Sequence, residues 1–271
     1  MTTSPVPTGA DGPAERADRL VGSDRVLAVL VELASIPTGA TLDALATRVH
    51  SPKATVHRAL AALKRAGLAR QDGRGHYVLG DEFLRLAFQH HDARPESVRV
   101  RPVLERLAER FGETAHYAVL DGDEIVYRAK VDPPEGAVRL TSTIGGRNPA
   151  RSTGVGKLLL SRTTSTIDEL RRRVGDGPFP ARTARSITTI EGLFDELERT
   201  RARGYAVDDQ ENEVGVNCIA VPLPFAVPGA TPGAVSISAL AYRTPLTDLV
   251  AALPEILEIV HGTAVEAERS A

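Results

Sequence analysis

The chain has 271 residues and a formal net charge of −2, with 42% hydrophobic and 25% charged residues. This length has room for two domains, and the composition is that of a globular protein rather than a disordered or fibrous one. No run of about 18 apolar residues is present, so no membrane partner is expected. The single cysteine, Cys218, excludes an internal disulfide and fits a reducing cytoplasm.

Positive charge is concentrated near the N-terminal end. Residues 20–85 hold nine basic and six acidic side chains, a net of +3, whereas residues 101–271 hold twenty basic and twenty-four acidic ones, a net of −4. This division indicates one domain for a polyanion and another for something else. Residues 1–19 are rich in Pro, Gly, Thr and Asp, resemble no signal peptide and are expected to form a disordered tail.

Residues 20–80 begin with two predicted short helices. The first runs from about Asp24 to Ala34 behind Ser23 as its N-cap, with apolar residues on one face. The second follows Thr41. Both have an apolar face that is expected to turn inward.

The third helix has stronger signals. Ser51 is its N-cap candidate, Pro52 takes the first helical position and Gly67 supplies a left-handed stop. A recognition helix needs an apolar face toward the domain and a polar N-terminal half toward base edges and phosphates. The predicted buried stripe is Val56, Ala59, Leu60 and Leu63.

A β-hairpin, or wing, is predicted after the third helix. Leu68–Gln71 and His76–Leu79 flank the turn Asp72–Gly75. Arg70 and Arg74 are thereby placed to touch phosphates. This order of elements predicts a winged helix-turn-helix domain, and the alternative is a small helical bundle with a solvated basic face. The predicted DNA contacts are Ser51, Lys53, Thr55, His57, Arg58, Lys64, Arg70 and Arg74.

Two of these side chains carry no permanent charge. Thr55 and His57 are therefore candidates for reading bases rather than phosphates. For His57 the alternative is packing against the wing.

Residues 81–100 are predicted to link this domain to the rest of the chain. Asp81–His91 has an amphipathic helical pattern, which Asp92–Pro95 breaks. Its apolar side is wide, so we expect it to bury against a second copy of itself. His90 and His91 are candidate metal ligands, but adjacent histidines point to different sides of a helix, which favours a polar helix end.

Residues 101–271 predict an α+β domain with a largely antiparallel sheet. Thr114–Leu120 and Glu124–Val131 flank Asp121-Gly122-Asp123, a strong hairpin signal. The segment STGVGKLLLS predicts a loop that enters a helix. Further strands are predicted at Val138–Thr143, Tyr205–Val207, Asn217–Pro222 and Ala234–Leu240, and further helices near residues 103–111, from Thr188 or Thr189 to Arg203, and from about Leu246 to Glu268 with a kink near Pro254.

The N-terminal domain resembles the winged helix of IclR-type bacterial transcription regulators. The later part of the chain is similar to that family in three blocks, NPARSTGVGKLLLS, RGYAVDDQENEVGVNCIAVPL and AVSISA. Their order and spacing match from about Leu20 to the C-terminus, and the second block is the most specific. The first block departs modestly, with Arg151 where the family commonly has His.

The resemblance implies a GAF-like effector-binding domain over residues 101–271. Backbone N–H groups at the start of the GK helix can bind a carboxylate, and two serines spaced by two residues share one face of a strand. The family also implies a homodimer or a dimer of dimers. Carried over position by position, the effector-binding candidates are Gly154, Val155, Asp208, Cys218, Ser236 and Ser238.

Each candidate also has a purely structural interpretation. Cys218 can be a small buried hydrophobe. Asp208 and Asp209 can make a turn or cap a helix. Ser236 and Ser238 can be core serines that bond to backbone.

Enzyme signatures are incomplete. A P-loop would need a glycine where Arg151 stands and a serine or threonine where Leu158 stands, and no GxSxG, CxxC or HExxH motif occurs. We therefore predict no catalytic residue, no metal site and no cofactor. The sequence also contains a cluster of four carboxylates. This cluster can attract a metal or act as acid and base, or it can simply form a solvated loop. Its members are Asp208, Asp209, Glu211 and Glu213.

The sequence thus predicts a cytoplasmic, DNA-binding transcriptional regulator, expected to be a repressor. Its partners would be double-stranded DNA with a near-palindromic operator, a small-molecule effector such as a carboxylate or polar ring compound, and further copies of itself. The alternatives are a small-molecule-binding protein that no longer binds DNA and an enzyme acting on a small organic acid.

Overall fold

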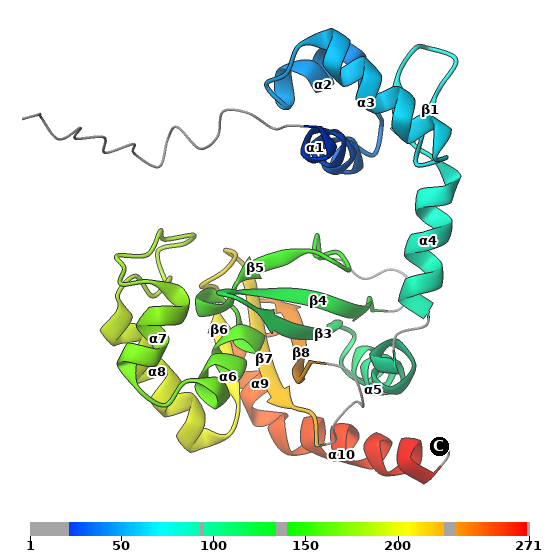
Figure 1. Ribbon diagram of the computed structural model, residues 1–271. Helices are drawn as coiled ribbons and strands as arrows, with labels where there is room; N and C mark the ends of the chain where they lie inside the picture. The colour runs from blue at the N-terminus through cyan, green and yellow to red at the C-terminus, as the bar shows by residue number, and fades with distance from the viewer. Residues whose placement is uncertain (1–21, 93–94, 134–139, 225–230, 270–271) are drawn as a thin grey trace, which may run out of the picture. The chain divides into compact units, whose positions relative to one another are not determined.

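The computed structural model describes residues 22–92, 95–133, 140–224 and 231–269 (Figure 1). The chain forms two compact units, residues 1–91 and residues 92–271. Within the described ranges, no helix is long and apolar enough to cross a membrane.

The first unit is a small helical core followed by a two-stranded hairpin. Val29, Leu45, Val56 and Leu60 are fully buried and join the helices and the hairpin into one apolar core. The winged helix-turn-helix order predicted from the sequence is thus confirmed. Its elements are α1 (Ser23–Ala34), α2 (Leu42–Arg48), α3 (Lys53–Arg65), β1 (Ala69–Gln71), β2 (Tyr77–Leu79) and α4 (Asp81–Asp92).

Two predicted helix caps are wrong. Helix α1 begins at Ser23 itself, and α3 begins at Lys53 with Pro52 in the N-cap position; neither helix has a side-chain cap. Pro52 has an extended ψ of 140°, so α3 starts one residue later than predicted. The Ser51 hydroxyl is then too far back to cap the helix and donates to the backbone oxygen of Val49 at 3.2 Å.

The predicted start of the second helix after Thr41, the glycine stop after the third helix and the turn of the wing are confirmed. The Thr41 side chain caps α2 by accepting the N–H of Ala44 at 3.2 Å. Gly67 follows α3 with a left-handed φ of +71°. In the wing, the Asp72 carboxylate accepts two backbone N–H groups of the turn at 2.8 and 2.9 Å, which fixes the hairpin.

The second unit is a six-stranded sheet with helices on both faces (Figure 1). All neighbouring strands in the order β5-β4-β3-β8-β7-β6 are antiparallel, so the predicted α+β class is confirmed. The elements are α5 (Pro95–Phe111), β3 (Thr114–Asp121), β4 (Glu124–Val131), β5 (Arg147–Pro149), the 3-10 helix η2 (Ala150–Ser152), α6 (Gly154–Thr163), α7 (Ile167–Val174), α8 (Ile190–Arg203), β6 (Ala206–Asp209), β7 (Val216–Pro222), β8 (Gly233–Leu240), α9 (Leu246–Ala251) and α10 (Leu253–Arg269).

Side chains that alternate along β8 point to opposite faces of the sheet. Val235 and Ile237 face the core formed with α5, α9 and α10. The even-numbered positions, Ser236 and Ser238, therefore face the side covered by α6 and α8. That side is lined by small residues such as Ala220, which lets α6 lie close to the sheet.

The second unit also departs from expectation. The long C-terminal helix is two helices that break at Ala252, because Pro254 fits only the first turn of α10. Residues 140–143 form no strand, and the rest of the predicted strand Val138–Thr143 lies outside the described residues. Two short elements, α7 and β5, were not predicted.

The N-terminal end of α6 rests directly on neighbouring backbone. A Cβ atom at Gly156 would lie 2.2 Å from the backbone oxygen of Ala150, and one at Gly154 would lie 3.5 Å from the Cβ of Ala220. Only glycine at position 156 permits this approach.

We expect Gly156→Ala to lower the free energy of unfolding by about 2 kcal/mol or more, because the added methyl group overlaps fixed backbone. Gly262→Ala is the matched control, since that helical glycine has open space around it; it should gain about 0.4–1 kcal/mol. Urea unfolding followed by circular dichroism checks both. Equal stabilities for the two variants would contradict the close approach.

Candidate functional site

The exposed face of the first unit carries most of the predicted DNA contacts. Six of them are exposed, and two, Ser51 and Thr55, are half-buried. The exposed six are Lys53, His57, Arg58, Lys64, Arg70 and Arg74.

Most of this positive charge is available to a partner. Lys53 makes an ion pair with Asp43 at 2.8 Å, but both side chains are about two-thirds exposed, so the pair is weak and easily exchanged. Arg58 and Lys64 make no ion pair with another described residue. A shallow hollow between α3 and the wing is lined by His57 and Lys64, among others.

A cavity of about 250 Å³ lies in the second unit. Its walls come from all six strands of the sheet, β3 to β8, from the start of α6, and from the segment that follows β6. These elements are distant in sequence, and the fold brings them together. All six predicted effector-binding residues line this cavity: Gly154, Val155, Asp208, Cys218, Ser236 and Ser238.

The start of α6 gives one wall its anion-binding character. Thr153 caps the helix by accepting the N–H of Gly156 at 3.1 Å. This leaves the N–H groups of Gly154 and Val155 without a partner among the described residues. Free N–H groups at a helix N-terminus favour a negatively charged group.

The opposite wall is a chain of hydrogen-bonding side chains on the sheet. Cys218 Sγ lies 2.9 Å from Ser238 Oγ, which lies 3.4 Å from His116 Nδ1. The other ring nitrogen, His116 Nε2, lies 2.8 Å from Ser142 Oγ. The Tyr127 ring packs on the His116 ring with centroids 4.7 Å apart, which adds an aromatic surface.

This Cys–Ser–His chain does not have the electrostatics of a catalytic site. Burial raises the pKa of the Cys218 thiol, and burial lowers the pKa of His116 to about 3. Both groups are therefore neutral at pH 7, whereas cysteine catalysis needs a thiolate. The chain can accept and donate hydrogen bonds to a bound molecule.

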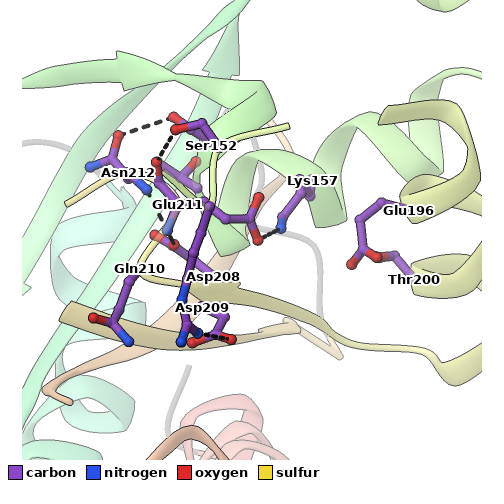
Figure 2. A network of polar contacts seen from close by, with 12 residues as sticks. Ser152, Lys157, Glu196, Thr200, Asp208, Asp209, Gln210, Glu211 and Asn212 are labelled. Atoms are coloured by element: carbon purple, nitrogen blue, oxygen red, sulfur yellow. Dashed lines mark hydrogen bonds and ion pairs between the residues drawn. The ribbon is translucent and has the colours of Figure 1, made fainter. Parts of the chain in front are cut away.

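Beneath the cavity lies a buried network of charges (Figure 2). Lys157 is fully buried and makes an ion pair with Glu211. One oxygen of Asp208 accepts the backbone N–H groups of Glu211 at 2.7 Å and Asn212 at 3.3 Å. Asp209 points elsewhere, to an ion pair with Arg185.

The network also bears on the P-loop and metal-binding interpretations of this part of the sequence. Lys157 is paired inside the protein, so it does not offer its charge to a phosphate as a P-loop lysine would. Over the residues that the structure describes, no group of three or more His, Cys, Asp or Glu side chains is placed to hold a metal ion.

Several cavity-lining residues were missed by the sequence reasoning. His116, Tyr127 and Asn148 lie on the strands β3, β4 and β5, and Arg182 lies in the segment between α7 and α8. His116 stands opposite Ser236 across the β3–β8 pair. Only knowledge of which strands are neighbours could have found it.

The family comparison settles the class of this protein. The family model described as the IclR helix-turn-helix domain matches residues 23–73, and the model of the bacterial transcriptional regulator IclR C-terminal domain matches residues 95–267. The chain belongs to the IclR family. It is therefore a DNA-binding transcriptional regulator and not an enzyme, as the sequence predicted.

Curated relatives and solved structures agree with this IclR-family membership. The chain is 32% identical to the Pca regulon regulatory protein of Pseudomonas putida over 88% of this chain and 82% of that one. It is 30% identical to the transcriptional repressor IclR of Escherichia coli K12 over 72% of each.

Two IclR crystal structures share this architecture. The Thermotoga maritima IclR has a TM-score of 0.69 and 25% identity, over 92% of this chain and 97% of that chain. An IclR homologue from Microbacterium hydrocarbonoxydans, complexed with 4-hydroxybenzoate, has a TM-score of 0.72 and 25% identity, over 90% and 98%.

We expect the neutral, buried His116 to make this IclR-family protein sensitive to acid. The unfolded chain binds a proton near pH 6.5 and the folded chain only near pH 3. Stability should therefore fall as the pH drops from 6.5 to 3, by at most about 1.4 kcal/mol per pH unit from this group. His116→Gln removes the titrating group and should flatten that slope in urea unfolding at several pH values.

His57→Gln is the matched control, because His57 is exposed on the first unit. It should keep the wild-type slope. An unchanged slope in the His116 variant would mean that other groups cause the acid sensitivity.

Proposed function

We propose that this chain is a cytoplasmic repressor whose first unit binds an operator and whose cavity binds a small carboxylic acid that changes operator affinity. One observation carries the proposal: six residues from separate segments line one cavity beside a helix N-terminus. The complex of the Microbacterium homologue with 4-hydroxybenzoate supports a small acid as effector. A cavity of about 250 Å³ has room for a single-ring acid.

The DNA contacts proposed for the first unit fall into two groups. The basic side chains Lys53, Arg58, Lys64, Arg70 and Arg74 would neutralise phosphates, because they are exposed on α3 and the wing. The remaining side chains, Ser51, Thr55 and His57, would position α3 or read base edges.

Changing Lys53 and Arg58 to Ala should remove two phosphate contacts. The slope of the logarithm of operator affinity against the logarithm of salt concentration should become shallower by about 0.9 for each lost contact. Mobility-shift titrations at several salt concentrations measure this slope. Arg85→Ala is the control, since Arg85 on α4 is already paired with Glu82 at 2.7 Å; a wild-type slope in the double variant would refute the assignment.

We also propose that two or four copies bind a near-palindromic operator together. Large apolar side chains are exposed on α1 and α4 of the first unit, including Leu27, Val31, Leu84 and Phe88, which are 46–69% exposed. Burying them between copies would remove apolar surface from water. Effector binding would then act on the paired first units through α4, the helix that leads the chain into the second unit.

Phe88→Glu places a charge in this apolar surface and should shift the protein toward monomers in analytical ultracentrifugation, with weaker operator binding. Gln89→Glu adds the same charge on a neighbouring exposed position of α4 and should leave assembly unchanged. A Phe88 variant that sediments like wild type would contradict the proposed interface. A monomer that protects one unrepeated half-site would contradict the symmetric operator.

The pocket assignment predicts that the serines of β8 hold the effector. The double change of Ser236 and Ser238 to Ala should weaken 4-hydroxybenzoate binding by roughly 1–3 kcal/mol, because polar groups of the acid lose their partners. Operator binding without the acid should stay intact, since a separate unit binds DNA. Calorimetry and mobility shift test both statements, with the exposed Ser165→Ala as control.

Two results would count against this pocket. Normal acid affinity in the double-serine variant would mean that the serines are structural. Loss of operator binding without acid would mean that the change has damaged the fold.

A further inference from the structure

The charges beneath the cavity are not balanced. The ammonium group of Lys157 is already in an ion pair with Glu211. The nearby Glu196 of α8 is already contacted by Arg199 at 3.0 Å and Arg203 at 2.8 Å. Asp208 makes no ion pair with a described residue, although it is 2% exposed and lines the cavity.

The carboxylates of Asp208 and Glu211 also lack hydrogen-bond donors. Asp208 Oδ1 accepts two backbone N–H groups, but no described group donates to its second oxygen. Glu211 has a more complete deficit, because its Oε2 is fully buried without any hydrogen-bond partner in the described structure, whereas the second oxygen of Asp208 is not fully enclosed. Buried carboxylate oxygens without donors are costly, and a bound proton would lower that cost.

The ionisable groups that line the cavity with Asp208 do not supply this donor as a charge. Arg182 directs its Nε to the backbone oxygen of Asn212 at 2.9 Å, and Glu213 is itself an acid. Cys218 of β7 and Tyr127 of β4 have raised pKa values through burial, and His116 of β3 has a lowered one, so all three are neutral. The Lys157 ammonium group of α6 is directed to Glu211 (Figure 2). Burial outweighs that nearby ammonium and raises the pKa of Asp208 to about 7.

A carboxylate ligand in the cavity would add a second negative charge next to Asp208. Its natural place is the start of α6, where the backbone nitrogen of Asp208 lies only 3.7 Å from the position of a Cβ at Gly154. Two ionised carboxylates side by side in a buried site repel each other, and one of them takes a proton.

We propose that the cavity binds a carboxylate ligand together with one proton, which Asp208 takes from water and donates to the ligand as a hydrogen bond. This inference rests on the proposed role of the cavity as the effector pocket. Affinity for an acid should then fall as the pH rises above the range in which empty Asp208 holds its proton. An uncharged ligand of the same shape should show no such dependence.

The test uses benzoate and benzamide as probes on the full-length protein. Calorimetry at pH 6 and pH 8, each in two buffers of different ionisation enthalpy, gives both the affinity and the number of protons taken up. Benzoate should bind about tenfold more weakly at pH 8 than at pH 6, with close to one proton taken up at pH 8. Benzamide affinity should be the same at both pH values.

Two variants identify the proton acceptor. Asp208→Asn keeps an oxygen for the two backbone N–H groups and should make benzoate binding independent of pH. Asp209→Asn is the matched control, because its carboxylate is exposed and paired with Arg185, and it should behave as wild type.

Each other outcome overturns the inference. Equal benzoate affinity at pH 6 and pH 8 with no proton uptake by the wild type would refute it, whether or not the variants fold. A persistent pH dependence in Asp208→Asn would place the proton elsewhere. Failure of benzoate to bind at either pH would refute the ligand class, and a mobility shift on operator DNA would show separately whether the proposed regulatory function stands.

Discussion

The Lys157 side chain is fully buried, and its ammonium group is paired with Glu211. Removing an ammonium group from water costs several kcal/mol unless a partner compensates it. The pair therefore ties α6 to the segment that follows β6, and with it the helix N-terminus to Asp208. The pair fixes the positions of these two segments. It is not expected to add much to the free energy of folding, because desolvation offsets most of the attraction in a buried ion pair. Loss of either partner would leave one buried charge unpaired and would distort two walls of the cavity at once.

Small residues make this arrangement possible. The helix can lie on the sheet because Gly154 and Gly156 face Ala220 and the backbone of Ala150. The same closeness places unpaired N–H groups opposite the hydroxyl and thiol groups of β7 and β8. A polar cavity inside an apolar layer follows from these two facts, and its walls suit a small molecule that carries one anionic end and hydrogen-bonding groups.

Charge is divided between the two units according to their partners. The basic residues of α3 and the wing are exposed, and most of them make no ion pair with another described residue, which suits a polyanion whose contacts form and break with salt. Several charges of the second unit have partners inside it: Arg243 pairs with Glu113 at 2.6 Å, and Arg201 donates to the backbone oxygens of Ser161 and Thr164 at the end of α6. One chain can thus hold an exposed basic surface in one unit and a small polar cavity in the other.

The sequence predicted the local elements better than their neighbours in space. Caps and turns with their own chemistry, such as Thr41, Thr189 and the hairpin at Gly122, were recognisable because they depend on a few adjacent residues. Helix α7 was overlooked although its sequence carries a local signal: Thr166 and Glu169 form a capping box, and Ile167, Leu170 and Val174 share one helical face. His116 escaped because its contact with Ser238 depends on the order of strands, which no local pattern contains.

We propose that occupation of the cavity and binding of operator DNA are energetically coupled. Thermodynamic linkage requires this coupling to be reciprocal. The most direct measurement is therefore the affinity for operator DNA with and without saturating benzoate, together with the affinity for benzoate with and without saturating operator. We predict that both affinities change by the same factor. Benzoate that fills the cavity while operator affinity stays the same would contradict this coupling.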